Sequence, residues 1–98
     1  MHEKVNLDNV EVDGYVIPLE GCNLVFASSG ACLLACGAID VDALDKFGIS
    51  AAKVTGVETV ADLMDGAVKG VNQHATRRGI SVGEQGRTAL LKMIQHQE

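Results

Sequence analysis

The sequence is poor in the residues that mark several common functional classes. Its 98 residues include no tryptophan, one tyrosine, two phenylalanines and one proline. Single-stranded nucleic acids are bound by basic grooves that carry aromatic stacking platforms. This chain has a net charge of −5, and only five scattered cations in residues 66–98, with almost no aromatic residues beside them. We therefore predict no nucleic-acid partner.

Long apolar runs are missing as well. No run approaches the roughly 18 residues of a membrane-spanning helix, and residues 1–8 lack the basic and apolar regions of a secretory signal. Hydrophobic residues make up 47% and charged residues 21% of the chain, which is a globular balance. We expect one domain over residues 1–98, with no membrane partner, in the cytoplasm, and with residues 1–4 and 95–98 mobile.

Cysteine is scarce and its spacing fits no metal site. The three cysteines form no Cys-x-x-Cys pair, and no His-x-x-x-His pattern accompanies them, so no metal site is predicted. In an extended strand Cys32 and Cys36 would lie about 13 Å apart, too far for a mutual disulfide. We interpret Cys22 and Cys32 as small buried apolar residues. No phosphate-binding or dinucleotide-binding glycine pattern is present, and the cofactor is unknown.

The first 40 residues alternate between apolar and polar side chains, as strands do. Val10 and Val12 alternate up to Asp13-Gly14, a favoured turn dipeptide, and the alternation resumes at residues 15–19, which predicts a hairpin. A second hairpin is predicted from residues 23–28 and 31–39 around the turn sequence Ser-Ser-Gly. Pro18 suits a strand edge.

After Gly37 the pattern changes to short helices. We predict a helix over residues 41–47 that ends at Gly48, a strand over 49–57, and a helix capped by Thr59 and Asp62. Two more helices are predicted over residues 67–79 and 86–95. The predicted fold class is α+β: N-terminal β-hairpins form a mixed sheet, with a short strand-helix-strand crossover and C-terminal helices packed on one face.

The candidate site residues cluster at the end of the second hairpin and at two helix starts. Cys36 is either a buried apolar residue or the nucleophile of a thiol-dependent enzyme. Asp40 and Thr59 are candidate polar ligands, and Arg87, in the sequence Gly-Glu-Gln-Gly-Arg, is a candidate anchor for a small anionic ligand. No catalytic triad or pair of carboxylates can be assembled, so enzymatic activity stays open.

Three segments together are similar to a known family. Residues 36–44, 53–65 and 77–93 resemble the YunC-like family of small bacterial and archaeal proteins, also called domain of unknown function 1805. The shared motif positions are Cys36, Gly37, Asp40, Gly56, Thr59, Asp62, Gly83, Gly86 and Arg87. The resemblance implies a small α+β protein that associates through its N-terminal β region and has no established activity. Gln85 and Thr88 depart from the family pattern, which removes a capping box from the last helix.

The sequence leaves two main functions open, beside a third possibility, which is metal binding through Cys36 and a residue of a neighbouring subunit. The first is a homo-oligomeric binding or assembly domain, a dimer or tetramer in which exposed edges of the N-terminal hairpins pair between subunits. Lysine at Val25, taken as an outward-facing strand residue, should then dissociate it. The alternative is a small-molecule site or thiol-dependent enzyme centred on Cys36, with Arg87 as the anion anchor.

Overall fold

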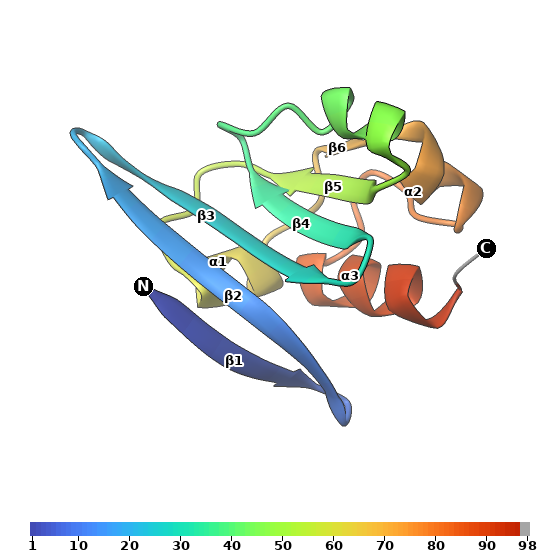
Figure 1. The fold of residues 1–98 in the computed structure, drawn as a ribbon, viewed down its shortest axis with the longest axis horizontal. Helices are drawn as coiled ribbons and strands as arrows, with labels where there is room; N and C mark the ends of the chain where they lie inside the picture. Colours follow the sequence, from blue (N-terminus) through green and yellow to red (C-terminus); the bar gives the residue numbers. More distant parts are fainter. Residues whose placement is uncertain (97–98) are drawn as a thin grey trace.

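The computed structural model describes residues 1–96, which form one six-stranded mixed sheet in the order β1-β2-β3-β4-β5-β6. Only β4 and β5 pair in parallel; the other neighbours are antiparallel. The strands are β1 (His2–Leu7), β2 (Val10–Leu19), β3 (Cys22–Ser29), β4 (Cys32–Cys36), β5 (Ser50–Val54) and β6 (Gly70–Val71). This arrangement confirms the predicted α+β class (Figure 1).

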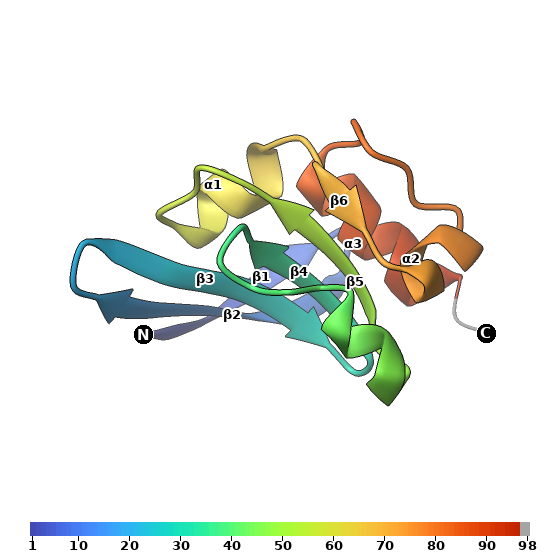
Figure 2. The same cartoon turned by 90° about the horizontal axis from the view of Figure 1, so that it is seen from above.

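The helices lie on both sides of this sheet. They are η1 (Ala43–Phe47, a 3-10 helix), α1 (Val60–Asp65), α2 (Gln73–Arg77) and α3 (Gly86–Gln95). Figure 2 shows α1 and α3 together on one face of the sheet and η1 on the other. The main core lies under α1 and α3 and includes the fully buried Leu34, Leu63 and Leu90. None of the helices within residues 1–96 is long and apolar enough to cross a membrane.

The first hairpin turns at a different place from the one predicted. Asp8 and Asn9 both have positive φ, as a tight two-residue hairpin turn requires. Asp13 and Gly14 lie inside β2, so the turn predicted there is wrong. The reason is long-range packing: a Cβ on Gly14 would stand 3.0 Å from both methyl groups of Val60 on α1. The glycine makes room for a helix and does not supply a turn.

The N-terminal residues belong to the sheet. Residues 2–4, expected to be mobile, form the first half of β1 and pair with residues 13–15 of β2. The Met1 amino group also donates a hydrogen bond to the carbonyl of Val16 at 2.7 Å. Gln95 ends α3, and the expectation for residues 97–98 lies outside the described part of the chain.

The second hairpin and the crossover agree with the sequence. β3 and β4 pair around Gly30, which has a positive φ of 56°. η1 then ends at Gly48, and β5 returns beside β4 in parallel. Val25, however, is fully buried, so lysine at that position would disrupt the core and could not test association.

The segment expected to be a helix over residues 67–79 is divided. Val68 is buried, Gly70 and Val71 form the edge strand β6, and α2 begins only after Asn72. The buried Asn72 side chain accepts from the backbone N–H groups of Ala51 and Ala75 and therefore caps the helix and holds β5. The last helix, in contrast, spans residues 86–95 as predicted and has no side-chain cap.

Candidate functional site

Cys36 is part of the sheet and is not an exposed thiol. It ends β4 with 4% of its surface exposed. The paired part of β3 and β4 stops at Phe26 and Ala35, and one step further the Cys36 sulfur accepts a hydrogen bond from the Val25 backbone N–H at 3.4 Å. The thiol therefore satisfies a buried backbone donor where the strands separate.

Asp40 and Thr59 act as caps. Asp40 Oδ1 accepts from the backbone N–H groups of Asp42 and Ala43, at the start of η1. Thr59 Oγ1 accepts from the N–H of Asp62 at 3.0 Å, which is the predicted helix cap. Both side chains thus use their oxygens on the backbone of their own segment.

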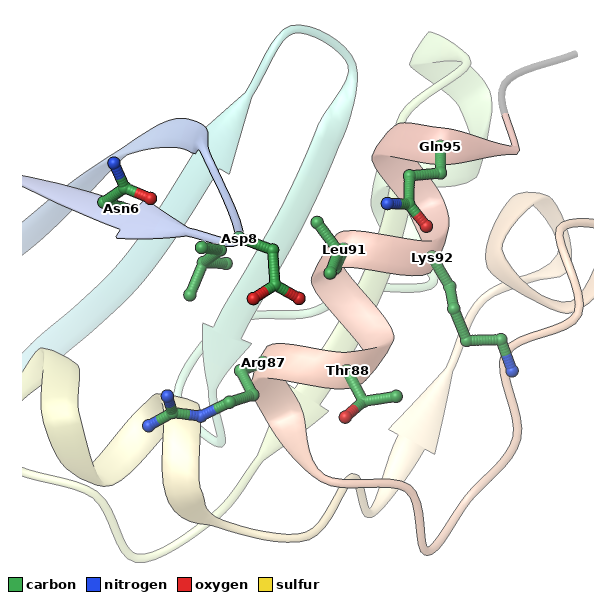
Figure 3. A pocket seen from close by; sticks show the side chains of 8 residues that line it. Asn6, Asp8, Arg87, Thr88, Leu91, Lys92 and Gln95 are labelled. Carbon is green, nitrogen blue, oxygen red and sulfur yellow. The ribbon is translucent and has the colours of Figure 1, made fainter.

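Arg87 is engaged in an exposed ion pair with Asp65, which joins the start of α3 to the end of α1. It lies on the rim of a cavity of about 390 Å³ between the first hairpin and α3 (Figure 3). The second cation of this cavity, Lys92, is paired with Glu84 at 2.8 Å and donates to the Gly79 carbonyl. Because both cations already have acceptors, the cavity has little unsatisfied positive charge to attract an anion.

The four candidate residues do not form one site. No hydrogen bond or ion pair within residues 1–96 joins Cys36, Asp40, Thr59 and Arg87 to one another. Nor does any group of three or more His, Cys, Asp or Glu side chains in that range gather as ligands of a metal ion would. The geometry therefore does not favour a thiol-dependent enzyme centred on Cys36.

A contact that the sequence does not reveal joins Cys32 to Arg78. The guanidinium donates to the Cys32 sulfur at 3.1 Å and approaches the Met93 carbonyl at 3.4 Å. Burial raises the pKa of the Cys32 thiol, and the charge and hydrogen bond of Arg78 offset this only in part. Because the pKa stays above its usual range, Cys32 remains a thiol at neutral pH and is not an activated nucleophile. Its spacing from Arg78 along the chain, 46 residues, gives no signal of the contact.

The thiols should differ sharply in reactivity. Cys22 is exposed, which makes its interpretation as a buried residue wrong, whereas Cys32 and Cys36 are buried. We expect a neutral alkylating reagent to modify one thiol per folded chain and all three after denaturation, as counted by mass spectrometry. The Cys22→Ser variant is the control and should leave the folded protein unmodified. Rapid native labelling of Cys36 would contradict the structural role assigned to it.

Asp45 holds the start of α2 from a distant part of the chain. Its carboxylate accepts from the ring Nδ1 of His74 at 2.8 Å and from the backbone N–H groups of Gln73 and His74 at 3.1 Å. The hydrogen bond from the His74 ring, followed by the backbone hydrogen bonds, holds the pKa of Asp45 below its usual value of 3.8, although desolvation opposes the shift. His74 is thus a half-buried partner of Asp45 at the start of α2.

Asp45→Asn should destabilise the fold in a pH-dependent way. Because the folded pKa lies below the unfolded one, Asp45 contributes stability above the unfolded pKa and loses it as the pH falls through the folded value. The difference in urea midpoint between wild type and variant should therefore be largest at about pH 6 and narrow by about pH 3. Asp42→Asn, an exposed neighbour, is the control and should show a smaller difference at both pH values. An Asp45→Asn difference that stays constant with pH would contradict the assignment.

The fold and its side chains define a small α+β domain whose polar clusters hold turns and helix ends. Residues 35–93 match the model of the family described as domain of unknown function (DUF1805), and this chain belongs to that family.

Two known proteins are similar over most of the chain. The "Uncharacterized protein YunC" of Bacillus subtilis (strain 168) is 33% identical over 99 residues, which covers 92% of this chain and 98% of the relative. The crystal structure of "a Protein of Unknown Function TA1206" from Thermoplasma acidophilum has a TM-score of 0.82. It covers 97% of this chain and 89% of the other at 22% identity, a likeness that shows the shared fold.

The motif positions of the family have structural roles in this chain. Gly56 and Gly83 have positive φ, of 73° and 101°, in tight turns. A Cβ on Gly86 would overlap with the backbone of Leu63, so this glycine permits the close approach of α1 and α3. Together with the caps at Asp40 and Thr59 and the ion pair of Arg87, these roles account for the motifs as elements of the fold.

Proposed function

We propose that this protein is a non-enzymatic, homo-oligomeric domain that associates, as a dimer or tetramer, through its N-terminal β region, strands β1 to β3. The observation that carries the proposal is the outer face of these strands. α1 and α3 cover the other face of the sheet, whereas Ile17 and Leu19 at the end of β2 are 44% and 51% exposed. Exposed apolar surface of this kind marks a protein interaction site when it is contiguous.

Aromatic side chains extend the same surface. The rings of His2, Tyr15 and Phe26 stack across β1, β2 and β3, with centroids 4.8 Å apart in both pairs. Cross-strand stacking holds these rings in fixed positions, so they offer a rigid apolar surface at little cost in side-chain entropy. Lys4, Glu11 and Asp13 lie on the same strands and form ion pairs with one another, so their charges are satisfied within the chain.

We also propose a cytoplasmic location, which the three unpaired cysteines support, since reduced thiols are typical of that compartment.

The solution mass tests the proposal. Native mass spectrometry and sedimentation of the untagged chain should give a dimer or tetramer at micromolar concentrations. Ile17→Lys should weaken the association, because it places a charge on the apolar face. Val82→Lys is the matched control: Val82 is 61% exposed but lies in the loop before α3, and its variant should associate like the wild type. A wild-type monomer at all concentrations would refute the proposal, and equal weakening by both variants would place the surface elsewhere.

A further inference from the structure

β1 leaves one edge of the sheet unpaired. Met1 and Val16 exchange two backbone hydrogen bonds, of 2.7 and 2.8 Å. In an antiparallel ladder such pairs alternate with pairs that are not hydrogen-bonded, so Glu3 and Val5 also face β2. The backbone N–H and C=O groups of His2, Lys4 and Asn6 therefore point away from the sheet. Within the described residues, no strand pairs with β1 on that side (Figure 1).

This edge lacks two of the usual protections against pairing, proline and a β-bulge. Sheet edges are commonly protected by proline, a bulge or a lysine that projects from the strand. β1 contains no proline and pairs with β2 without interruption. Its one lysine, Lys4, turns back over the sheet, where its Nζ lies 2.9 Å from Asp13 Oδ1 and 3.7 Å from Glu11 Oε1.

We propose that β1 pairs with β1 of a second copy in antiparallel orientation, about a twofold axis that passes beside Val5. This inference rests on the proposed self-association and adds an edge contact to the outer face described above. In this register Val5 faces Val5 of the second copy. Lys4 and Asn6 exchange backbone hydrogen bonds between the copies, and Glu3 faces Leu7.

The register of the β1–β1 pair depends on which residue lies at the twofold axis, because that residue faces its own copy. Like charges directly opposite each other destabilise a sheet. An axis at Glu3 or at Lys4 would oppose two identical charges. Val5 is apolar and half-buried against the main core, so it is the strand residue that best tolerates its own copy across the axis.

The charges along the strand support the same arrangement. The first half of β1 carries His2, Glu3 and Lys4, while the turn at its other end carries Asp8. Antiparallel pairing places each end opposite the other, and in the Val5 register His2 stands opposite Asp8 of the second copy. The Lys4 register would allow two more backbone hydrogen bonds, but it opposes the two ammonium groups and moves His2 away from Asp8.

Cross-linking tests the register. Each variant is made in the Cys22→Ser background, because Cys22 is exposed and would link on its own. Val5→Cys should form a disulfide-linked dimer under mild oxidation, since residues opposite each other in a pair without hydrogen bonds have Cα atoms about 4.5 Å apart. Lys4→Cys is the matched control: its two copies would lie more than about 7 Å apart and should not link.

A backbone substitution tests the edge without a new thiol. The Lys4 N–H points away from β2, so Lys4→Pro removes an edge donor and leaves the β1–β2 ladder intact. We expect Lys4→Pro to halve the solution mass. Lys4→Ala, which loses the same ion pairs but keeps the N–H, should stay assembled.

The outcomes separate this inference from the proposed function. Cross-linking of Val5→Cys together with dissociation of Lys4→Pro supports the register. Cross-linking of Lys4→Cys in place of Val5→Cys would overturn it in favour of an axis at Lys4. An assembled wild type whose mass Lys4→Pro does not change would overturn edge pairing but leave self-association standing. A monomeric wild type would overturn both.

Discussion

Replacing Asn72 with alanine should lower the free energy of unfolding by about 3–4 kcal/mol. Asn72 is 1% exposed, and its side chain makes four hydrogen bonds to the backbone. The oxygen accepts from Ala51 on β5 and from Ala75 in α2. The amide nitrogen donates to the carbonyls of Val41 and Ile49, which flank η1.

The large expected effect follows from what the substitution leaves behind. Alanine would leave two N–H groups and two carbonyls without their partner in the interior, and each buried unsatisfied group costs about 1–3 kcal/mol, less what water recovers. A loss of this size is a large share of the 5–15 kcal/mol that typically stabilises a domain. It would lower the melting temperature by roughly 12 °C or more in a chain of this size.

Urea and thermal unfolding followed by far-UV circular dichroism measure this loss at a fixed protein concentration, because association shifts apparent stability. Gln73→Ala is the control: Gln73 is exposed, and only its backbone takes part in the contacts described. A loss for Asn72→Ala no larger than that for Gln73→Ala would show that water replaces the amide without cost.

Asn72→Asp separates the two halves of the network. The carboxylate keeps both accepted hydrogen bonds but loses both donors and faces the carbonyl oxygens of Val41 and Ile49. Burial and these two carbonyl oxygens favour the neutral form, whereas the N–H groups of Ala51 and Ala75 favour the charged form. We expect the first effect to be the larger, so that the folded pKa lies above the unfolded one. The variant should therefore be most stable below the unfolded pKa and lose stability as the pH rises toward the folded value. A variant whose stability increases as the pH rises over this range would contradict the hydrogen bonds from the Asn72 amide nitrogen to the carbonyls of Val41 and Ile49.

Local signals in the sequence predicted much of the fold. The helix over residues 86–95 and the cap at Thr59 were predicted correctly, because each depends on contacts within a few residues. The parallel crossover between β4 and β5 was also predictable from a short helix between two apolar strands.

The main wrong predictions have a common cause, which is contacts between residues that lie far apart in the sequence. Asp8-Asn9 and Asp13-Gly14 are both turn dipeptides, and the second lies within a strand because Val60, some 46 residues later, packs on Gly14. The position of Cys36 at the end of a strand made it a candidate reactive residue. In the structure its sulfur accepts a hydrogen bond from the Val25 backbone N–H, a contact between separate strands. The network of Asn72 likewise joins segments 21 and 31 residues away, which no local pattern records.

Gly86→Ala should destabilise the protein by at least about 2 kcal/mol, although helix propensity predicts a gain of about 1 kcal/mol. The contacts around Gly86 decide whether the loss from overpacking or the gain from helix propensity is larger. Gly86 is buried in the first turn of α3, and a Cβ there would overlap with the Leu63 carbonyl oxygen and stand 3.1 Å from Leu34 Cδ2. Neither group can move easily, since the first is backbone of α1 and the second lies in the fully buried core.

The close approach that Gly86 permits also carries a hydrogen bond, from its N–H to the Gly66 carbonyl at 2.7 Å. Separating α1 from α3 to admit a methyl group would weaken this bond along with the packing beneath it. Thr88→Ala is the control, because Thr88 is exposed on the same helix and its replacement should be neutral or slightly stabilising. Urea midpoints of the two variants make the comparison. A Gly86→Ala variant as stable as Thr88→Ala would mean that the helices separate at almost no cost, and the role of this glycine would have to be sought outside the packing of α1 on α3.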